Sequence, residues 1–166
     1  MKFKLNVEEG YAGFLGIDIV KKDDGTIELL QMGLIDRILE MLDLDGERVL
    51  TKPTPAVTET IGKDENGPPR KELWNYASLV GMMLYLASNL RPDIAFAVHQ
   101  CARFTHCPKL VHEQAIKRIA RYLKGTREMG LRFQPTDDLD LELFADANFA
   151  GLWNAKDPQD PTCVKS

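Results

Sequence analysis

The residues with the clearest chemical potential are a cluster of cations in the second half of the chain. Five of them fall within eleven residues that contain no acid: Lys117, Arg118, Arg121, Lys124 and Arg127. Such side chains can neutralise phosphates, which gives binding that is independent of sequence and weakened by salt. The alternative interpretation is the solvated face of an amphipathic helix, and the residues alone leave both open. The net charge of −4 argues against a general nucleic-acid binder but permits one basic face.

Histidines and cysteines gather between residues 99 and 112 without the intervals of a zinc finger or ribbon. They are His99, Cys101, His106, Cys107 and His112. We expect Cys101 in the core, the histidines at the surface or half-buried, and no metal site. The chain has no GxSxG motif, no glycine-rich phosphate loop and no cysteine with an orienting partner, so the sequence does not favour nucleophilic catalysis.

Composition indicates an intracellular protein, cytoplasmic or nuclear. The three cysteines are an odd set, and no secretory signal precedes them. The longest apolar run, Leu79–Ala87, is about half of the roughly 20 residues that a membrane span needs. We therefore expect no membrane partner.

The first elements predicted are a β-hairpin and a helix. Residues 11–30 alternate around a turn at Lys21–Gly25, which is typical of a hairpin. Apolar residues at helical spacing follow until Asp45-Gly46: Leu34, Ile35, Ile38, Leu39 and Leu42. The proline-rich residues 47–71 predict an exposed connector between two packing units.

Three helices and two strands are predicted next. The first helix carries an apolar stripe from Tyr76 to Ala87, and the second restarts at Arg91-Pro92-Asp93, where proline suits the first turn. In the third, which runs from Pro108 to Gly125, one face is apolar and should point inward: Ile116, Ile119, Ala120 and Leu123. Lys117, Arg121 and Lys124 share the outer face. Leu131–Phe133 and Leu139–Asp146 then predict paired strands.

Several motifs, taken in order, resemble those of copia-type LTR retrotransposon Pol polyproteins. They are FLGIDI (Phe14–Ile19), TPAV (Thr54–Val57), NYASLVGMMLYLASNLRPDIAFAV, RYLKGT and FADANFAG. The resemblance covers nearly the whole chain and implies the segment from the end of the reverse transcriptase palm, through the thumb region, to the first strand of RNase H. The family's aromatic-x-Asp-Asp polymerase motif is absent, Ala77 stands where arginine is usual, and Asn148 where a second aspartate is common.

This resemblance implies roles for particular residues. Phe14, Leu15 and Gly16 would belong to a hairpin that grips the primer, and the basic helix face would contact a duplex. Asp146 resembles the first Mg²⁺ ligand of RNase H, although an ordinary exposed aspartate at a strand end is the alternative. RNase H chemistry needs several carboxylates around two metal ions, and only Asp157 and Asp160 follow. Mg²⁺ therefore belongs to the parent enzyme, and we expect neither tight Mg²⁺ binding nor a complete catalytic site here.

The expected fold class is α+β in two loosely joined parts. Residues 1–46 would form a palm remnant, 47–71 the connector, 72–127 a thumb-like three-helix bundle, and 128–166 a β-hairpin beginning a truncated RNase H-like sheet. The expected function is a catalytically incomplete piece of the polyprotein with residual binding to an RNA–DNA or DNA duplex, whose other partners are the remaining parts of that polyprotein. The alternative is a domesticated, non-enzymatic helical interaction module. An unpaired RNase H edge would favour self-association.

Overall fold

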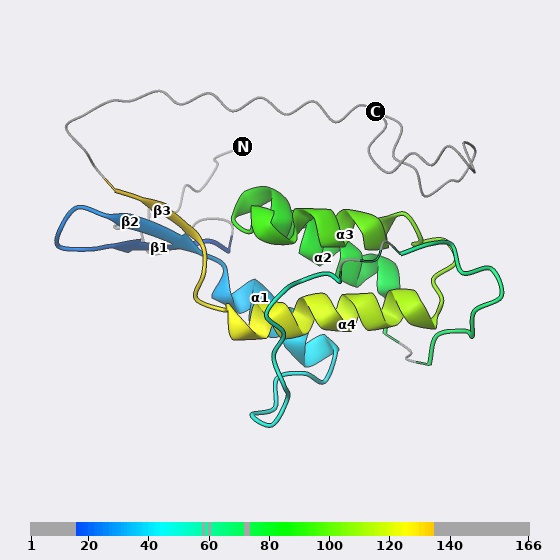
Figure 1. Cartoon of the computed structure of the whole chain (residues 1–166). Helices are drawn as coiled ribbons and strands as arrows, with labels where there is room; N and C mark the ends of the chain where they lie inside the picture. The colour runs from blue at the N-terminus through cyan, green and yellow to red at the C-terminus, as the bar shows by residue number, and fades with distance from the viewer. Residues whose placement is uncertain (1–15, 58, 60, 72–73, 135–166) are drawn as a thin grey trace, which may run out of the picture.

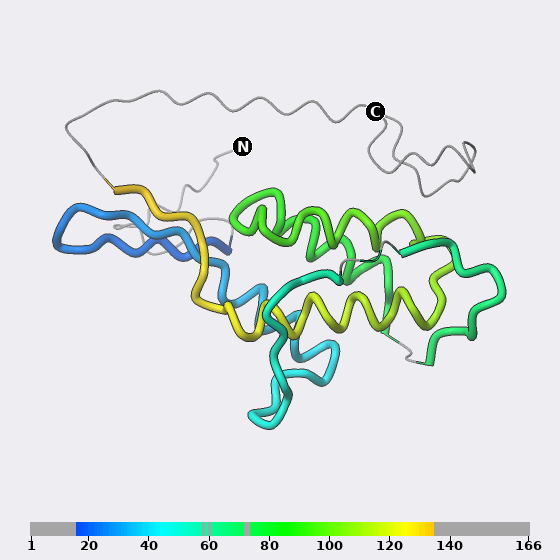
Figure 2. Tube along the Cα trace, viewed as in Figure 1, coloured from blue at the N-terminus to red at the C-terminus, as the bar shows by residue number. Residues whose placement is uncertain are grey.

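The computed structural model of this chain describes residues 16–57, 59, 61–71 and 74–134. In that part of the chain, a small antiparallel sheet lies at one end of a helical bundle (Figures 1 and 2). The α+β class expected from the sequence is confirmed.

The sheet begins with the predicted hairpin. Strand β1 (Asp18–Lys21) pairs antiparallel with β2 (Ile27–Leu30), so that Lys21 faces Ile27. The Asp24 carboxylate closes the turn by accepting a 2.9 Å hydrogen bond from the Thr26 N–H. Hydrogen bonds from Thr26 hold the pKa of Asp24 below its ordinary value. Gly25 adopts φ 83°, a left-handed conformation that glycine adopts without strain.

The third strand of the sheet comes from the other end of the described chain. Strand β3 (Leu131–Phe133) pairs antiparallel with β2, and Leu131 lies opposite Leu29. Gly130 leads into this strand at a point where a Cβ atom would lie 2.0 Å from the carbonyl oxygen of Leu29, so only glycine fits. The sequence predicts the strand but not this partner. Residues 139–146, its predicted partner, lie outside the described residues.

The helices match the predicted positions. They are α1 (Met32–Met41), α2 (Tyr76–Asn89), the 3-10 turn η1 (Pro92–Ile94), α3 (Ala95–Ala102) and α4 (Leu110–Gly125). Helix α2 starts where Asn75 accepts a 2.9 Å hydrogen bond from the Ser78 N–H. Gly125 is the last residue of α4 rather than its cap, which is Thr126. A Cβ at Gly125 would lie 3.0 Å from the Cβ of Thr51, so the connector passes too close for a larger residue.

One core joins all four α-helices. Ile35, Ile38 and Leu39 of α1 are buried in the same apolar cluster as Ile116 and Leu123 of α4. Helix α1 packs against both α2 and α4. The expectation of two loosely joined parts is therefore wrong for α1 and the three later α-helices, which share this core.

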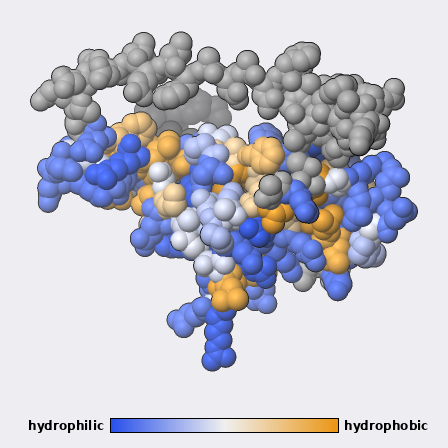
Figure 3. All heavy atoms as spheres, in the orientation of Figure 1, coloured by the Kyte–Doolittle hydropathy of each residue, from blue (hydrophilic) through white to orange (hydrophobic). Residues whose placement is uncertain are grey.

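The connector is mostly exposed, as expected, yet it is fixed to the bundle. Val49, Ala56 and Ile61 pack against the core. Elsewhere on the surface, Figure 3 shows hydrophobic side chains in separate patches among hydrophilic ones. Within the described residues, no helix combines the length and the hydropathy needed to cross a membrane.

Candidate nucleic-acid interface on helix α4

Helix α4 separates apolar from basic side chains as its sequence predicts. Its inward face is buried, with Ile116, Ile119, Ala120 and Leu123 each at most 1% exposed. The four predicted cations, Lys117, Arg118, Arg121 and Lys124, are half-exposed on the remaining faces. Their positions on the helix agree with the spacing, but their contacts divide them into two groups.

Lys124 is an anchor between α4 and the loop after α1. Its Nζ donates to the carbonyl oxygens of Leu44 and Asp45, each at 3.2 Å, and to that of Gly46. These carbonyls follow Asp43, whose φ of 55° turns the chain out of α1. A cation suits such a cluster of carbonyl oxygens, since it donates to all three at once. Lys124 is therefore engaged in holding the fold together.

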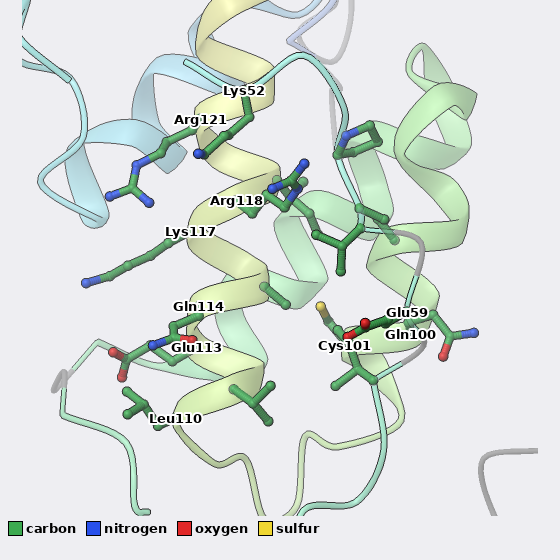
Figure 4. Close-up of a pocket in the computed structure, with 18 of the residues that line it drawn as sticks. Lys52, Glu59, Gln100, Cys101, Leu110, Glu113, Gln114, Lys117, Arg118 and Arg121 are labelled. Atoms are coloured by element: carbon green, nitrogen blue, oxygen red, sulfur yellow. The ribbon is translucent and has the colours of Figure 1, made fainter. Parts of the chain in front are cut away.

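Lys117, Arg118 and Arg121 lie beside a further cation that the connector supplies. The Lys52 N–H donates to the Arg121 carbonyl oxygen at 3.3 Å, and Arg118 Nη2 donates to Thr54 Oγ1 at 2.8 Å. Lys52 thus reaches α4 from another part of the chain, and Lys117 and Arg121 extend from α4 on the same side (Figure 4). Positive charge from two segments is concentrated here in a chain of net charge −4.

These cations border a cavity of about 630 Å³ between α3, α4 and the connector. Its apolar lining includes Ala97 and Cys101 from α3 and Ala115 and Ile119 from α4. Burial raises the pKa of the Cys101 thiol to about 12, so this cysteine stays a neutral core residue. Its predicted core position is confirmed by an exposed fraction of 0%.

A buried arginine fixes the end of α4 to the restart before α3. Arg91 is 2% exposed and binds Asp93 through two hydrogen bonds, of 2.9 Å from Nε and 2.7 Å from Nη2. The same guanidinium donates to the carbonyl oxygen and hydroxyl of Thr126, at 2.9 and 2.7 Å. Tyr122 completes the group by donating its hydroxyl to Asp93 at 2.7 Å. We call Arg91, Asp93, Tyr122 and Thr126 the helix-end clamp.

The clamp also sets the protonation of its members. Burial works to raise the pKa of Asp93, but hydrogen bonds from Arg91 and Tyr122 outweigh it and lower the pKa below its ordinary value. Burial and the bond to Asp93 raise the pKa of Tyr122. Asp93 is thus charged and Tyr122 neutral at physiological pH. The RPD and RYLKGT motifs, which the sequence shows thirty residues apart, form this one network.

His112 ties the connector to the start of α4. Its side chain is 0% exposed, so the expectation of a surface or half-buried histidine is wrong at this position. Its Nδ1 accepts from the Lys109 N–H at 2.8 Å, so Nε2 carries the proton and donates to the Gly62 carbonyl oxygen at 2.9 Å. The ring stacks on Phe104 with centroids 4.3 Å apart. Burial lowers the pKa of His112, which keeps the ring neutral.

The remaining predicted site residues are only partly within the described chain. Phe14, Leu15 and Asp146 lie outside it, so the primer-grip and Mg²⁺ expectations stay predictions. Gly16 is described and has φ 76° in open surroundings. Among the described residues, no three His, Cys, Asp or Glu side chains come together as metal ligands would.

Sequence reasoning missed the clamp and the buried His112. A partial signal for the clamp is present, because Arg91 and Asp93 flank the proline that restarts the helical pattern. Their pairing with Tyr122 and Thr126 across about thirty residues needs the packing of α3 on α4, which no local pattern shows. His112 is buried only because a connector 50 residues earlier in the sequence passes over it.

Comparison with known proteins adds three similarities. A retrovirus-related Pol polyprotein from transposon RE1 of Arabidopsis thaliana is 32% identical over 152 residues, which are 90% of this chain and 10% of that protein. A putative transposon Ty5-1 protein of Saccharomyces cerevisiae is 30% identical over 139 residues, 84% of this chain and 44% of the relative. Secreted RxLR effector protein 161 of Plasmopara viticola is 41% identical over 76 residues, 46% of this chain and 54% of the effector.

The chain spans less than two thirds of the length of each of these relatives. No protein-family model matches it, and no solved structure matches it.

Proposed function

We propose that this chain, whose homologues are retrotransposon Pol polyproteins, is the part of such a polyprotein that joins reverse transcriptase to RNase H. The chain matches these homologues as a copia-type pol segment would. In this proposal the chain binds a nucleic-acid duplex through the backbone phosphates. The observation that carries the binding is the grouping of Lys52, Lys117 and Arg121 along one helix.

The fold supports such a role by holding α4 firmly against α1 and α3. Arg127, just beyond α4, binds Asp36 of α1 through two hydrogen bonds of 2.6 Å each. The helix-end clamp and Lys124 fix the same end of α4 from other sides. A rigid helix keeps its cations in one register along a duplex, and phosphate contacts of this kind position a protein without reading sequence.

The chain itself is proposed to bind rather than to cleave. Asp146 alone supplies one carboxylate of the set that a two-metal site requires, with Mg²⁺ provided in the context of the parent enzyme. The parent's copying of RNA and degradation of the RNA strand would depend on residues supplied by the rest of the polyprotein.

Salt-dependent binding to a fluorescein-labelled RNA–DNA hybrid, followed by fluorescence anisotropy, tests the proposal. We expect the full chain to bind with an affinity that falls steeply between about 50 and 200 mM salt. Lys117→Ala and Arg121→Ala should each weaken binding and reduce the slope of log K against log salt concentration by about 1.

Two control variants distinguish an effect on duplex binding from an effect on the stability of the fold. Arg48→Ala removes an exposed cation away from the cavity and should leave binding unchanged. Lys124→Met should lower the unfolding temperature, because three carbonyl oxygens lose their donor. Binding that is absent, insensitive to salt, or equally reduced by Arg48→Ala would refute the proposal.

A second candidate function is a non-enzymatic interaction module, domesticated from a mobile element. The similarity to a secreted effector protein of Plasmopara viticola favours it, since that relative is named for a different role. Sequencing the transcript that encodes the chain distinguishes the two. A reading frame that continues into polymerase and RNase H motifs supports the polyprotein, and a frame limited to this chain supports the module.

A further inference from the structure

Exposed apolar side chains from three separate segments meet at the cavity beside α4. Phe96 of α3 is 58% exposed, Val57 of the connector 54% and Val111 of α4 37%, and all three line the cavity. Exposed apolar residues that lie singly need no explanation, whereas a concave group with a polar rim is typical of an interaction site. Phosphate binding by the neighbouring cations makes no use of these residues.

The rim of this cavity is positively charged. Five cationic side chains and two acidic ones line it: Lys52, Lys71, Lys117, Arg118 and Arg121, against Glu59 and Glu113. Glu113 is 3% exposed and already accepts a hydrogen bond from the Lys71 N–H at 3.1 Å, so it offers little to a ligand. The Nε of Arg118 is buried and has no hydrogen-bond partner among the described residues. Cationic side chains therefore outnumber acidic ones in the lining.

We propose that this cavity docks an acidic segment of a protein partner that also carries apolar side chains. Carboxylates of the segment would pair with Arg118 and the cations around it, and its apolar side chains would cover Phe96 and Val111. The connector lies along α4 through the bonds of Lys52 and Thr54, and it forms one wall of the cavity. The inference goes beyond duplex binding, because its central residues are apolar.

The test uses the full chain and a short fluorescein-labelled peptide that alternates aspartate with leucine or phenylalanine, followed by fluorescence anisotropy. We expect saturable binding that weakens with salt. A peptide with asparagine in place of aspartate should bind at least about tenfold more weakly, because charged hydrogen bonds are the stronger ones. Arg118→Gln should reduce both the affinity for the acidic peptide and its salt dependence.

Phe96→Ser and Val111→Ser distinguish this site from the duplex-binding face. Both side chains are exposed, so the variants should fold, and each should raise the Kd for the peptide by about tenfold or more. The matched control is Met129→Ser, a 50% exposed apolar residue outside the cavity. Hybrid binding should be unaffected by Phe96→Ser.

Three results would overturn the inference: no saturable binding of the acidic peptide, equal binding of the asparagine peptide, or binding unchanged in both Phe96→Ser and Val111→Ser. Loss of hybrid binding in Phe96→Ser would also count against it, since the cavity would then serve nucleic acid. Failure of the duplex experiment alone leaves these outcomes untouched, because neither Phe96 nor Val111 belongs to the proposed phosphate contacts.

Discussion

Burying an arginine is costly unless every part of its guanidinium is satisfied, and Arg91 shows how this chain meets that condition. Its donors reach Asp93 and Thr126, and its charge lies 5.6 Å from the centroid of the Tyr122 ring. The RPD motif is thus accounted for by structure. Its arginine holds two helices together and has little surface left to offer a ligand.

We predict that Arg91→Met lowers the free energy of unfolding by about 2–4 kcal/mol. The substitution keeps the apolar stem but leaves the Thr126 carbonyl oxygen and Asp93 without their main donor. Asp93 retains 31% of its side-chain exposure, so water can offset part of the loss. Urea unfolding followed by circular dichroism measures the change.

Arg48→Met is the matched control, because Arg48 is exposed. Its effect should stay within about 0.5 kcal/mol. Equal stability of the Arg91 and Arg48 variants would show that the clamp contributes nothing to the fold.

His112 makes stability depend on pH. Its pKa is lower in the folded chain than the ordinary value of 6.5, so the unfolded chain takes up a proton first as pH falls. The contribution of His112 is fully present above pH 6.5 and is lost as pH falls from there toward the folded pKa. Protonation of Nδ1 would also break the hydrogen bond that Nδ1 accepts from the Lys109 N–H at the start of α4.

We therefore expect the free energy of unfolding to fall between pH 7.5 and 5.5, by at most about 1.4 kcal/mol per pH unit from one group. His112→Gln should flatten this dependence, whereas His99→Gln, at an exposed position, should leave it intact. Urea titrations at the two pH values give the comparison. A dependence that persists unchanged in His112→Gln would assign it to other groups.

At the scale of elements, the entry into β3 is closely packed against the backbone of β2. A Cβ at Gly130 would lie 2.0 Å from the Leu29 carbonyl oxygen and 2.9 Å from Leu30 Cδ2, so the strand could not keep its register with β2. The closer of these two contacts is with the backbone carbonyl of Leu29, which cannot move aside as a side chain can. The entry into β3 therefore has no easy way to relax.

Gly130→Ala is predicted to lower the free energy of unfolding by more than about 1 kcal/mol, the reverse of the usual gain from replacing glycine. Gly33→Ala provides the contrast. Gly33 lies inside α1 with open space around it, and alanine there should stabilise the chain by about 0.5–1 kcal/mol. Thermal unfolding of the Gly130→Ala and Gly33→Ala chains measures both changes in stability. A stabilised Gly130→Ala chain would mean that β3 does not enter the sheet through Gly130 as described.

The elements divide into those that local patterns predict and those that they do not. The hairpin turn at Asp24 and the apolar face of α4 follow from spacing, and both are where the sequence places them. The pairing of β3 with β2 is non-local and rests on a close backbone approach at Gly130. The partners of Lys124 are backbone carbonyls about eighty residues away, which side-chain patterns do not reveal.

At the scale of the whole molecule, a shared core joins the four α-helices. Ile38 of α1 is 0% exposed within the cluster that also contains Ile116 of α4. Damage on one side of such a core is transmitted to the other.

We predict that Ile38→Ala costs about 2–5 kcal/mol and lowers protection throughout α1, α2 and α4 alike. Amide hydrogen exchange measured by mass spectrometry resolves the helices separately. The exposed Val20→Ala in β1 should not change exchange in α4. Loss of protection limited to α1 would show two units and contradict a single core.

The pairing of β3 with β2 also has a consequence in time. Strand β3 leaves the ribosome about a hundred residues after β2, which at ordinary synthesis rates is a delay of about 5–20 s. Throughout that interval the hairpin presents one edge of β2 without its neighbour. The helices between the two strands are synthesised within that interval, and the sheet can be completed only when β3 arrives.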